Sequence, residues 1–146
     1  MSSHSLLEVE CPSCGKKREI VIWQMVDVTR EPERREEIFT GKINYFTCDG
    51  CDFEGFITAP LVYLDMEKEF CVQYVPVEFF EDTGYLKESF TPDGGVRTGL
   101  PANTAESPEL SCMQGAHIVF SMAELIRYVL FRERLGQVFA ETGGES

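Results

Sequence analysis

The stretch CPSCGKK, from Cys11 to Lys17, holds two cysteines that are separated by two residues and followed by a glycine. This spacing lets both thiolates reach one tetrahedral ion from a tight turn, in which Pro12 restricts the backbone and Gly15 supplies a positive φ. The same spacing also occurs in redox-active dithiols. A metal site of this kind needs two further sulfur ligands from elsewhere in the chain.

A second pair lies in CDGCD, where Cys48 and Cys51 have the same spacing and Asp52 follows in place of a glycine. Aspartate is one of the few other residues that adopt the left-handed backbone region, so the turn is expected to keep its geometry. Two such turns are typical of a structural zinc site, in which four thiolates close the coordination sphere. The expected metal ligands are Cys11, Cys14, Cys48 and Cys51.

The same ligand set also suits iron, so a rubredoxin-like Fe(Cys)4 electron carrier is an alternative to one structural Zn²⁺. The second turn lacks the proline and glycine of rubredoxin turns, which disfavours iron. A thioredoxin-type dithiol would need one pair at a helix N-terminus within a βαβ pattern, and neither pair lies there. Zinc is therefore the expected metal.

Each cysteine pair lies between two apolar stretches, which predicts two strand–turn–strand units. Between them, TREPERREEIFTGK predicts a short helix from about Pro32 to Phe39, opened by Pro32 and closed by Gly41. This inserted helix accounts for the long separation of the two pairs. A zinc-ribbon-like lobe is expected within residues 6–58.

Residues 59–120 are predicted to form an acidic β body with a mobile loop. A hairpin turn at DMEK leads into EFCVQYVPV, whose alternation predicts a strand that ends near Pro76. Residues 91–110 are rich in Gly, Pro, Ser, Thr and Asn, which predicts a long surface loop.

The clearest element is a C-terminal helix, predicted over residues 121–136. Ser121 and Glu124 have the spacing of a capping box, and Gly136 is expected to end or interrupt the helix. Its apolar stripe is expected to pack on the sheet and consists of Met122, Leu125, Ile126, Val129 and Leu130, continuing towards Phe139. Residues 1–146 are thus expected to form a single α+β domain: an antiparallel β-sheet with a zinc-ribbon-like lobe, one short helix and a long C-terminal helix.

The chain has 146 residues and a formal net charge of −12, which is unevenly placed. Residues 1–50 hold seven basic and nine acidic side chains, so most of the negative charge lies in the remainder. The electrostatic field of this negative charge repels phosphate backbones and anionic lipids. The charge therefore argues against nucleic acid and membrane partners and favours a basic protein partner. The basic run Lys16, Lys17 and Arg18 is interpreted as balancing the charge of the thiolates.

No apolar run is long enough to span a bilayer, and MSSHSLLEVEC has neither a basic nor an apolar signal-peptide region. A cytoplasmic location is therefore expected, where cysteines stay reduced.

Two cysteines lie outside the pairs. Cys71 falls within a predicted strand and is expected to be a buried thiol. Cys112 precedes His117 by five residues, which raises the alternative of a cysteine-dependent enzyme, but no third orienting group or oxyanion turn accompanies them. The sequence favours a non-catalytic protein-binding or adaptor role, such as that of an accessory subunit in a larger complex. No pattern specifies an oligomeric state.

Four segments, CPSCG, GKINYFTCDGCDFEG, APLVYLDMEKEFCVQYVP and HIVFSMAELIRYVLFRERLG, together resemble the CpXC domain family, which is named for two C-P-x-C motifs. The resemblance covers most of residues 6–136. It implies that the four paired cysteines are shared metal ligands, and it implies no particular activity. This sequence departs from the family pattern at two positions of the second motif. Asp49 replaces the proline, and Asp52 replaces the glycine.

Overall fold

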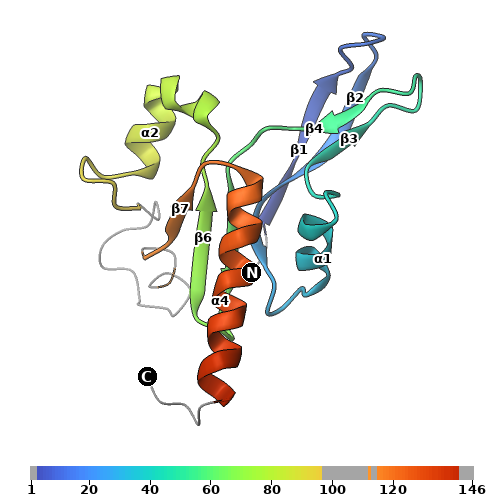
Figure 1. Ribbon diagram of the computed structural model, residues 1–146. Coiled ribbons are helices and arrows are strands. Elements are labelled where there is room, and N and C mark those ends of the chain that lie inside the picture. Colours follow the sequence, from blue (N-terminus) through green and yellow to red (C-terminus); the bar gives the residue numbers. More distant parts are fainter. Residues whose placement is uncertain (1–2, 97–111, 113–114, 142–146) are drawn as a thin grey trace.

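The computed structural model describes residues 3–96, 112 and 115–141. Its main element is a five-stranded sheet in the order β1-β2-β5-β6-β7, with the helix α4 packed across it (Figure 1). The α+β class is confirmed. The strands of this sheet are β1 (Ser3–Glu10), β2 (Lys17–Asp27), β5 (Leu61–Asp65), β6 (Phe70–Tyr74) and β7 (His117–Val119).

The sheet is mixed, whereas the sequence predicted an antiparallel one. The neighbours β1–β2 and β5–β6 are antiparallel, but β2 pairs with β5 and β6 pairs with β7 in parallel. Parallel neighbours need a long crossover, because a tight turn can only reverse the chain. Residues 28–60 and 75–116 supply the two long connections. These two connections are long enough to let β5 run parallel to β2 and β7 run parallel to β6.

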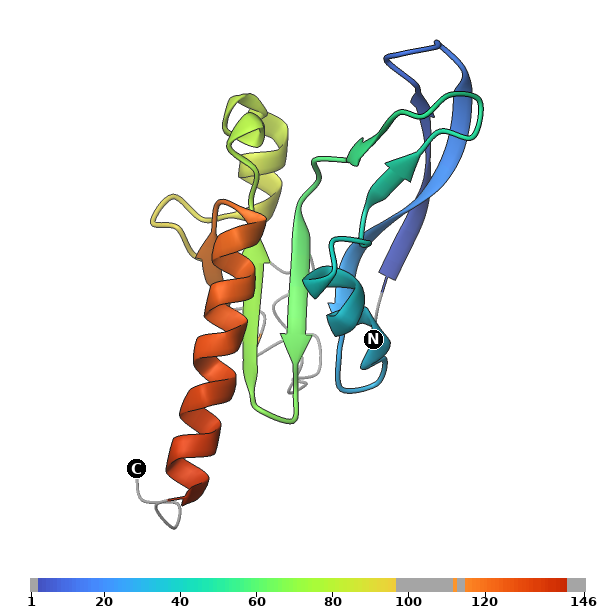
Figure 2. The ribbon, with the colours of Figure 1, turned by 45° about the vertical axis from the view of Figure 1, so that its right-hand side comes forward.

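The first long connection contains α1 (Glu33–Phe39) and a small antiparallel sheet of β3 (Tyr45–Thr47) and β4 (Glu54–Phe56). The predicted helix bounds are confirmed, since Pro32 is the N-cap residue and Gly41, just after the helix, has a φ of +75°. The β3–β4 hairpin lies beside the β1–β2 hairpin (Figure 2). We call the tips of the two hairpins, residues 9–20 and 45–57, the cysteine lobe.

The long C-terminal helix α4 (Met122–Glu141) begins with the predicted capping box. The Ser121 hydroxyl accepts a hydrogen bond from the Glu124 backbone N–H at 3.1 Å. The helix continues to Glu141, so the prediction that Gly136 ends or interrupts it is wrong. A glycine costs a helix interior up to about 1 kcal/mol, which the flanking helix formers outweigh here.

The buried face of α4 is narrower than the sequence predicted. Leu125 and Val129 are fully buried, each stabilising the fold by roughly 1.5–3 kcal/mol, whereas Leu130 is 47% exposed. Phe139, expected to continue the stripe, is exposed as well. The main core joins α4 and α1 to the sheet and consists of Val26, Val28, Ile38, Ile43, Leu61, Tyr63, Phe70, Val72, Val119, Leu125 and Val129.

Because α4 is continuous, replacing Gly136 with alanine is expected to stabilise the protein by about 0.5–1 kcal/mol. A Cβ added at Gly136 would meet nothing within 4 Å. The measurement is the free energy of unfolding in urea. The matched control is Gly95→Ala, whose Cβ would lie 2.8 Å from the Thr91 hydroxyl oxygen and should give no stabilisation. A loss of stability in Gly136→Ala would contradict a continuous helix.

Two short helices lie where the sequence analysis predicted none, the 3₁₀ helix η1 (Val77–Glu81) and α2 (Thr83–Ser89). Asp82 caps α2, because its carboxylate accepts a hydrogen bond from the Tyr85 backbone N–H at 3.0 Å. Asp82 itself, a preferred N-cap residue, was the available signal in the sequence. Most of the predicted loop, residues 97–110, lies outside the described residues.

The predicted hairpin turn at DMEK is confirmed between β5 and β6. Asp65 is buried and its carboxylate accepts a hydrogen bond from the Lys68 backbone N–H at 3.0 Å, while Glu69 has a φ of +57°. Across the part of the chain that the structure describes, no helix has both the length and the apolar character needed to cross a membrane.

Candidate metal centre

The four paired cysteines lie together at the tips of the two hairpins. Cys11 and Cys14 belong to the turn between β1 and β2, and Cys48 and Cys51 to the turn between β3 and β4. Their sulfur atoms all lie within 4.8 Å of one another. The Cys11 and Cys51 sulfurs are 3.6 Å apart, and the Cys14 and Cys48 sulfurs 3.7 Å apart. Each of these close pairs therefore joins one turn to the other.

These distances fit one metal ion better than any other use of four thiols. A metal bound to sulfur at about 2.3 Å in a tetrahedron holds its ligands about 3.8 Å apart. A disulfide would need about 2.05 Å, and all six cysteines of the chain are free. The cluster could therefore hold a metal ion.

Backbone hydrogen bonds close the two turns in the same way. The Cys11 N–H donates to the Lys16 carbonyl and the Cys48 N–H to the Phe53 carbonyl, each at 2.9 Å. Gly15 has the expected positive φ of +75°. The left-handed backbone expected at Asp52 is wrong, because positive φ among the described non-glycine residues occurs only at Asn44 and Glu69. The second turn therefore forms its closing hydrogen bond without a positive φ at Asp52.

The environments of the thiols differ. Cys11 and Cys48 are only 1% and 2% exposed, whereas Cys14 is exposed. Burial acts to raise the pKa of Cys48, but the Gly50 backbone N–H and the neighbouring thiols lower it to about 6. At Cys51 the Phe53 backbone N–H acts to lower the pKa, and burial with the neighbouring thiols raises it to about 11. Without a metal, these environments therefore favour the thiolate at Cys48 and the thiol at Cys51.

Basic side chains that follow the first turn contact the second turn. Arg18 forms an ion pair with Asp49, the residue that replaces the second motif's proline. A Cβ added at Gly50 would lie 3.2 Å from Cδ of Lys16, so the Lys16 stem lies over this glycine. Lys16 and Arg18 therefore contact the second turn, whereas the Lys17 ammonium lies 3.9 Å from the Glu8 carboxylate on β1.

Asn44 connects the cysteine lobe to β2 and was not identified from the sequence. Its Oδ1 accepts a hydrogen bond from the Trp23 N–H at 2.7 Å, and its Nδ2 donates to the Trp23 carbonyl at 3.1 Å. The Asn44 carbonyl also accepts the Ile57 N–H at 2.8 Å. Asn44 is 7% exposed and has a φ of +50°. An asparagine soon after the helix-ending glycine in GKIN was the available signal, since asparagine tolerates this backbone.

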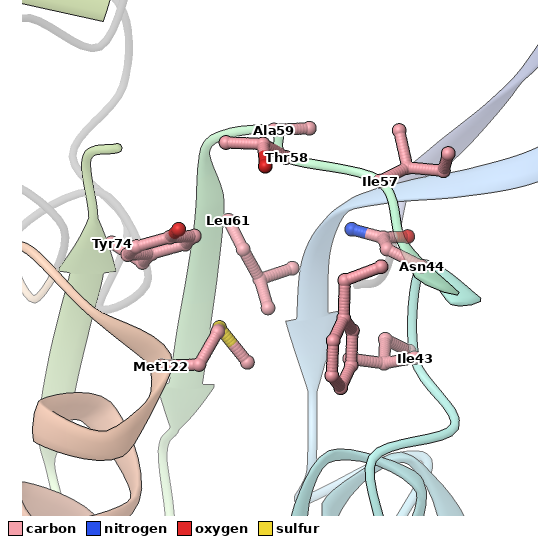
Figure 3. A pocket seen from close by; sticks show the side chains of 9 residues that line it. Ile43, Asn44, Ile57, Thr58, Ala59, Leu61, Tyr74 and Met122 are labelled. Carbon is pink, nitrogen blue, oxygen red and sulfur yellow. The ribbon is translucent and has the colours of Figure 1, made fainter. Parts of the chain in front are cut away.

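A small pocket lies where the cysteine lobe meets the main sheet, with Asn44 on one side and Tyr74 and Met122 on the other (Figure 3). Its volume of about 40 Å³ is far below the roughly 300–1,000 Å³ of ligand pockets. Its lining residues are Ile43, Asn44, Phe56, Ile57, Thr58, Ala59, Leu61, Tyr74 and Met122. It has room for only a few water molecules.

The alternative pair Cys112 and His117 lacks the features of a nucleophile and its base. The His117 ring stacks face to face on Tyr128, with centroids 4.1 Å apart and an interplanar angle of 3°. Burial raises the pKa of Cys112, against the opposing charge of Arg132. A nucleophilic cysteine needs a lowered pKa, because the thiolate is the reactive form. Cys71 is buried as predicted, and burial raises its pKa to about 12.

Since both pKa values are raised, Cys112 and Cys71 are expected to react slowly with iodoacetamide at pH 7, and faster as the pH rises towards those pKa values. The measurement is peptide mass spectrometry of the metal-loaded protein over a time course. Fast labelling of Cys112 at pH 7, within the time in which a free thiol peptide reacts, would contradict this assignment and revive the cysteine-enzyme alternative.

The comparisons with known proteins agree with the resemblance seen in the sequence. A family model described as CpXC protein matches residues 9–135, which is most of the chain and includes both cysteine turns. No curated protein and no solved structure matches the chain.

Proposed function

We propose that this chain, which belongs to the CpXC family, is a non-catalytic protein-binding domain whose clustered cysteines hold one structural Zn²⁺. The observation that carries the proposal is the four-sulfur cluster itself. Four thiolates complete a tetrahedral sphere and leave no position for substrate, so such a metal stabilises a fold instead of reacting. The proposed ligands are Cys11, Cys14, Cys48 and Cys51.

The size of the cysteine lobe supports a structural role for the metal. Its buried residues are only Cys11, Phe46 and Cys48, with partly buried neighbours around them. The strands β3 and β4 have three residues each, and a hairpin this short is marginal by itself in water. A metal cross-link between the two turns supplies the stabilisation that this small core lacks.

A second hollow lies between α1, α4 and the β5–β6 turn, and the pairing of its charges supports a non-catalytic role. Its volume is about 350 Å³, and four of its charged side chains form two ion pairs. Arg35 donates two hydrogen bonds to Glu133, both at 2.8 Å, and the Lys68 ammonium lies 3.8 Å from the Asp65 carboxylate. Charges that are paired in this way hold helices and turns together and are not poised for acid–base chemistry.

An exposed aromatic patch is the surface best suited to a protein partner. Val77, Phe80 and Phe120 are 54%, 47% and 46% exposed, and the two phenylalanine rings pack edge to face with centroids 5.7 Å apart. Glu78 and Glu81 are exposed on the same 3₁₀ helix as Val77. Aromatic residues are enriched at interfaces, and the acidic surround favours a basic partner.

Metal analysis tests the first half of the proposal. The purified protein is expected to be colourless and to hold about one zinc ion per chain by elemental analysis. A red protein whose colour bleaches reversibly on reduction would instead indicate iron in the same four-sulfur cage and an electron carrier. A protein with neither metal would overturn the proposed cross-link.

Affinity purification from the native host tests the second half. A stoichiometric partner is expected with the wild-type chain and is expected to be lost with the double variant Phe80→Ser, Phe120→Ser at unchanged zinc content. Leu130→Ser is the matched control, because Leu130 is equally exposed on α4. Partners that bind all three proteins equally, or no partner at all, would contradict the proposed surface.

A further inference from the structure

The strand β1 is an open edge of the main sheet. It is eight residues long and lies first in the strand order, and within the described residues it pairs only with β2. The pairing is regular from His4 to Glu10, since the one register shift falls between Ser3 and His4. The other side of β1 therefore presents a row of backbone N–H and C=O groups (Figure 2).

This edge lacks most of the usual protection against pairing, although Glu8 and Glu10 near its end are charged. Natural edges carry lysine, proline or a central bulge, and the sequence SHSLLEVE of β1 contains neither lysine nor proline. Leu6 and Leu7 are instead 63% and 42% exposed, and Val21, which lies opposite Leu6 on β2, is 43% exposed. A long and regular edge with two exposed leucines at its centre is a template for strand addition.

Charge favours a second copy of this chain at this edge over its other surfaces. Two chains that each carry −12 repel one another over most of their surfaces. The β1–β2 hairpin, residues 3–27, is close to neutral, with three basic and four acidic side chains. A second copy can therefore approach here without bringing two strongly acidic surfaces together.

We propose that β1 pairs antiparallel with β1 of a second copy, about a two-fold axis at Leu6, and joins two five-stranded sheets into one. This register places Leu6 against its own counterpart, and since Val21 lies opposite Leu6, an apolar row of four side chains crosses the interface. It also places His4 of each copy opposite Glu8 of the other.

The pairing of His4 with Glu8 of the second copy would offset an unfavourable like-charge contact that Glu8 makes within the single chain. Glu8 lies opposite Glu19 on β2, a like-charge pair that is unfavourable across a sheet. The nearest basic group, the Lys17 ammonium, is 3.9 Å from the Glu8 carboxylate and both side chains are largely exposed. An imidazole on the other side of Glu8 supplies a hydrogen-bond donor, and no like charges face each other in this register.

The mass of the zinc-loaded protein in solution, measured by light scattering across a wide concentration range, tests the dimer. Twice the mass of one chain is expected for the wild type, and the mass of one chain for Leu6→Lys, which places two ammonium groups on the axis. Leu130→Lys is the matched control, since Leu130 is an exposed leucine on α4, and it should remain dimeric. A wild type that stays monomeric, or a dimer that survives Leu6→Lys, would overturn the proposal.

A charge exchange tests the register. His4→Glu is expected to weaken the dimer at least tenfold, because carboxylates then face each other across the interface. Adding Glu8→Lys to His4→Glu should restore the wild-type dissociation constant, since the new carboxylate of each copy then meets the new ammonium group of the other. These side chains are four residues apart on one strand and cannot compensate within a chain. Failure of the double variant to recover would contradict an axis at Leu6.

Discussion

Replacing Cys48 with serine is expected to abolish stoichiometric zinc binding and to unfold the cysteine lobe while the main core stays folded. Cys48 is 2% exposed and its sulfur lies 3.7 Å from that of Cys14, on the other turn. A serine hydroxyl does not replace a thiolate as a zinc ligand. Structural zinc contributes about 10–16 kcal/mol to the folding of zinc-finger peptides. The loss of one of the four ligands is therefore expected to remove more stabilisation than the small core of the lobe can replace.

The expected effect is local because the two clusters of buried residues are separate. The main core joins α4 to the sheet and includes no cysteine of the metal cluster, whereas the cysteine lobe has Phe46 as its only fully buried residue other than cysteine. Hydrogen exchange measured by mass spectrometry should therefore show lost protection in β3 and β4 and retained protection in α4. A chelator added to the wild type should reproduce this pattern.

Cys71→Ala is the matched control, since Cys71 is also buried but lies in β6 within the main sheet. It should keep one zinc per chain and lose about 1 kcal/mol of stability through the missing sulfur contacts. If Cys48→Ser kept the zinc content and the protection of the wild type, the proposed cross-link would be wrong. If all protection were lost, the two clusters would form one cooperative unit.

The elements predicted correctly from the sequence are those set by neighbouring residues. The two cysteine turns follow from a spacing of three residues, α1 from Pro32 and Gly41, and the start of α4 from Ser121 and Glu124. In each case the residues that determine the geometry lie within one or two turns of chain. The sequence also predicted that the two cysteine pairs lie together, because one pair supplies only two of the four ligands that a tetrahedral metal site needs.

The features that were predicted wrongly, or not at all, depend on residues far apart in the sequence. The parallel pairing of β2 with β5 depends on how the connection of residues 28–60 crosses the sheet, which periodicity does not reveal. The exposure of Leu130, directly after the buried Val129, depends on which face α4 turns towards the sheet. Asp49 departs from the family motif, and its ion pair with Arg18 of the other turn is visible only in three dimensions.

Replacing Asn44 with alanine is expected to cost about 3 kcal/mol of stability, a large effect for a residue outside the two cores and the metal cluster. Two terms add. The Trp23 N–H and carbonyl lose their partners at 2.7 and 3.1 Å, and because this site is only partly buried, each loss costs close to the lower end of about 1–3 kcal/mol. The φ of +50° at Asn44 costs alanine about 1 kcal/mol more than asparagine or glycine.

Two further variants separate the terms in urea unfolding of the zinc-loaded protein. Asn44→Gly loses both side-chain hydrogen bonds but not the left-handed preference, so it should be about 1 kcal/mol more stable than Asn44→Ala. Thr47→Ala, at an exposed position of β3, should change stability by no more than about 0.5 kcal/mol. All three should keep their zinc, because the cysteines lie at the hairpin tips and Asn44 lies at the base of the lobe. A cost for Asn44→Ala as small as that of Thr47→Ala would show that the side chain does not act as a partner for β2.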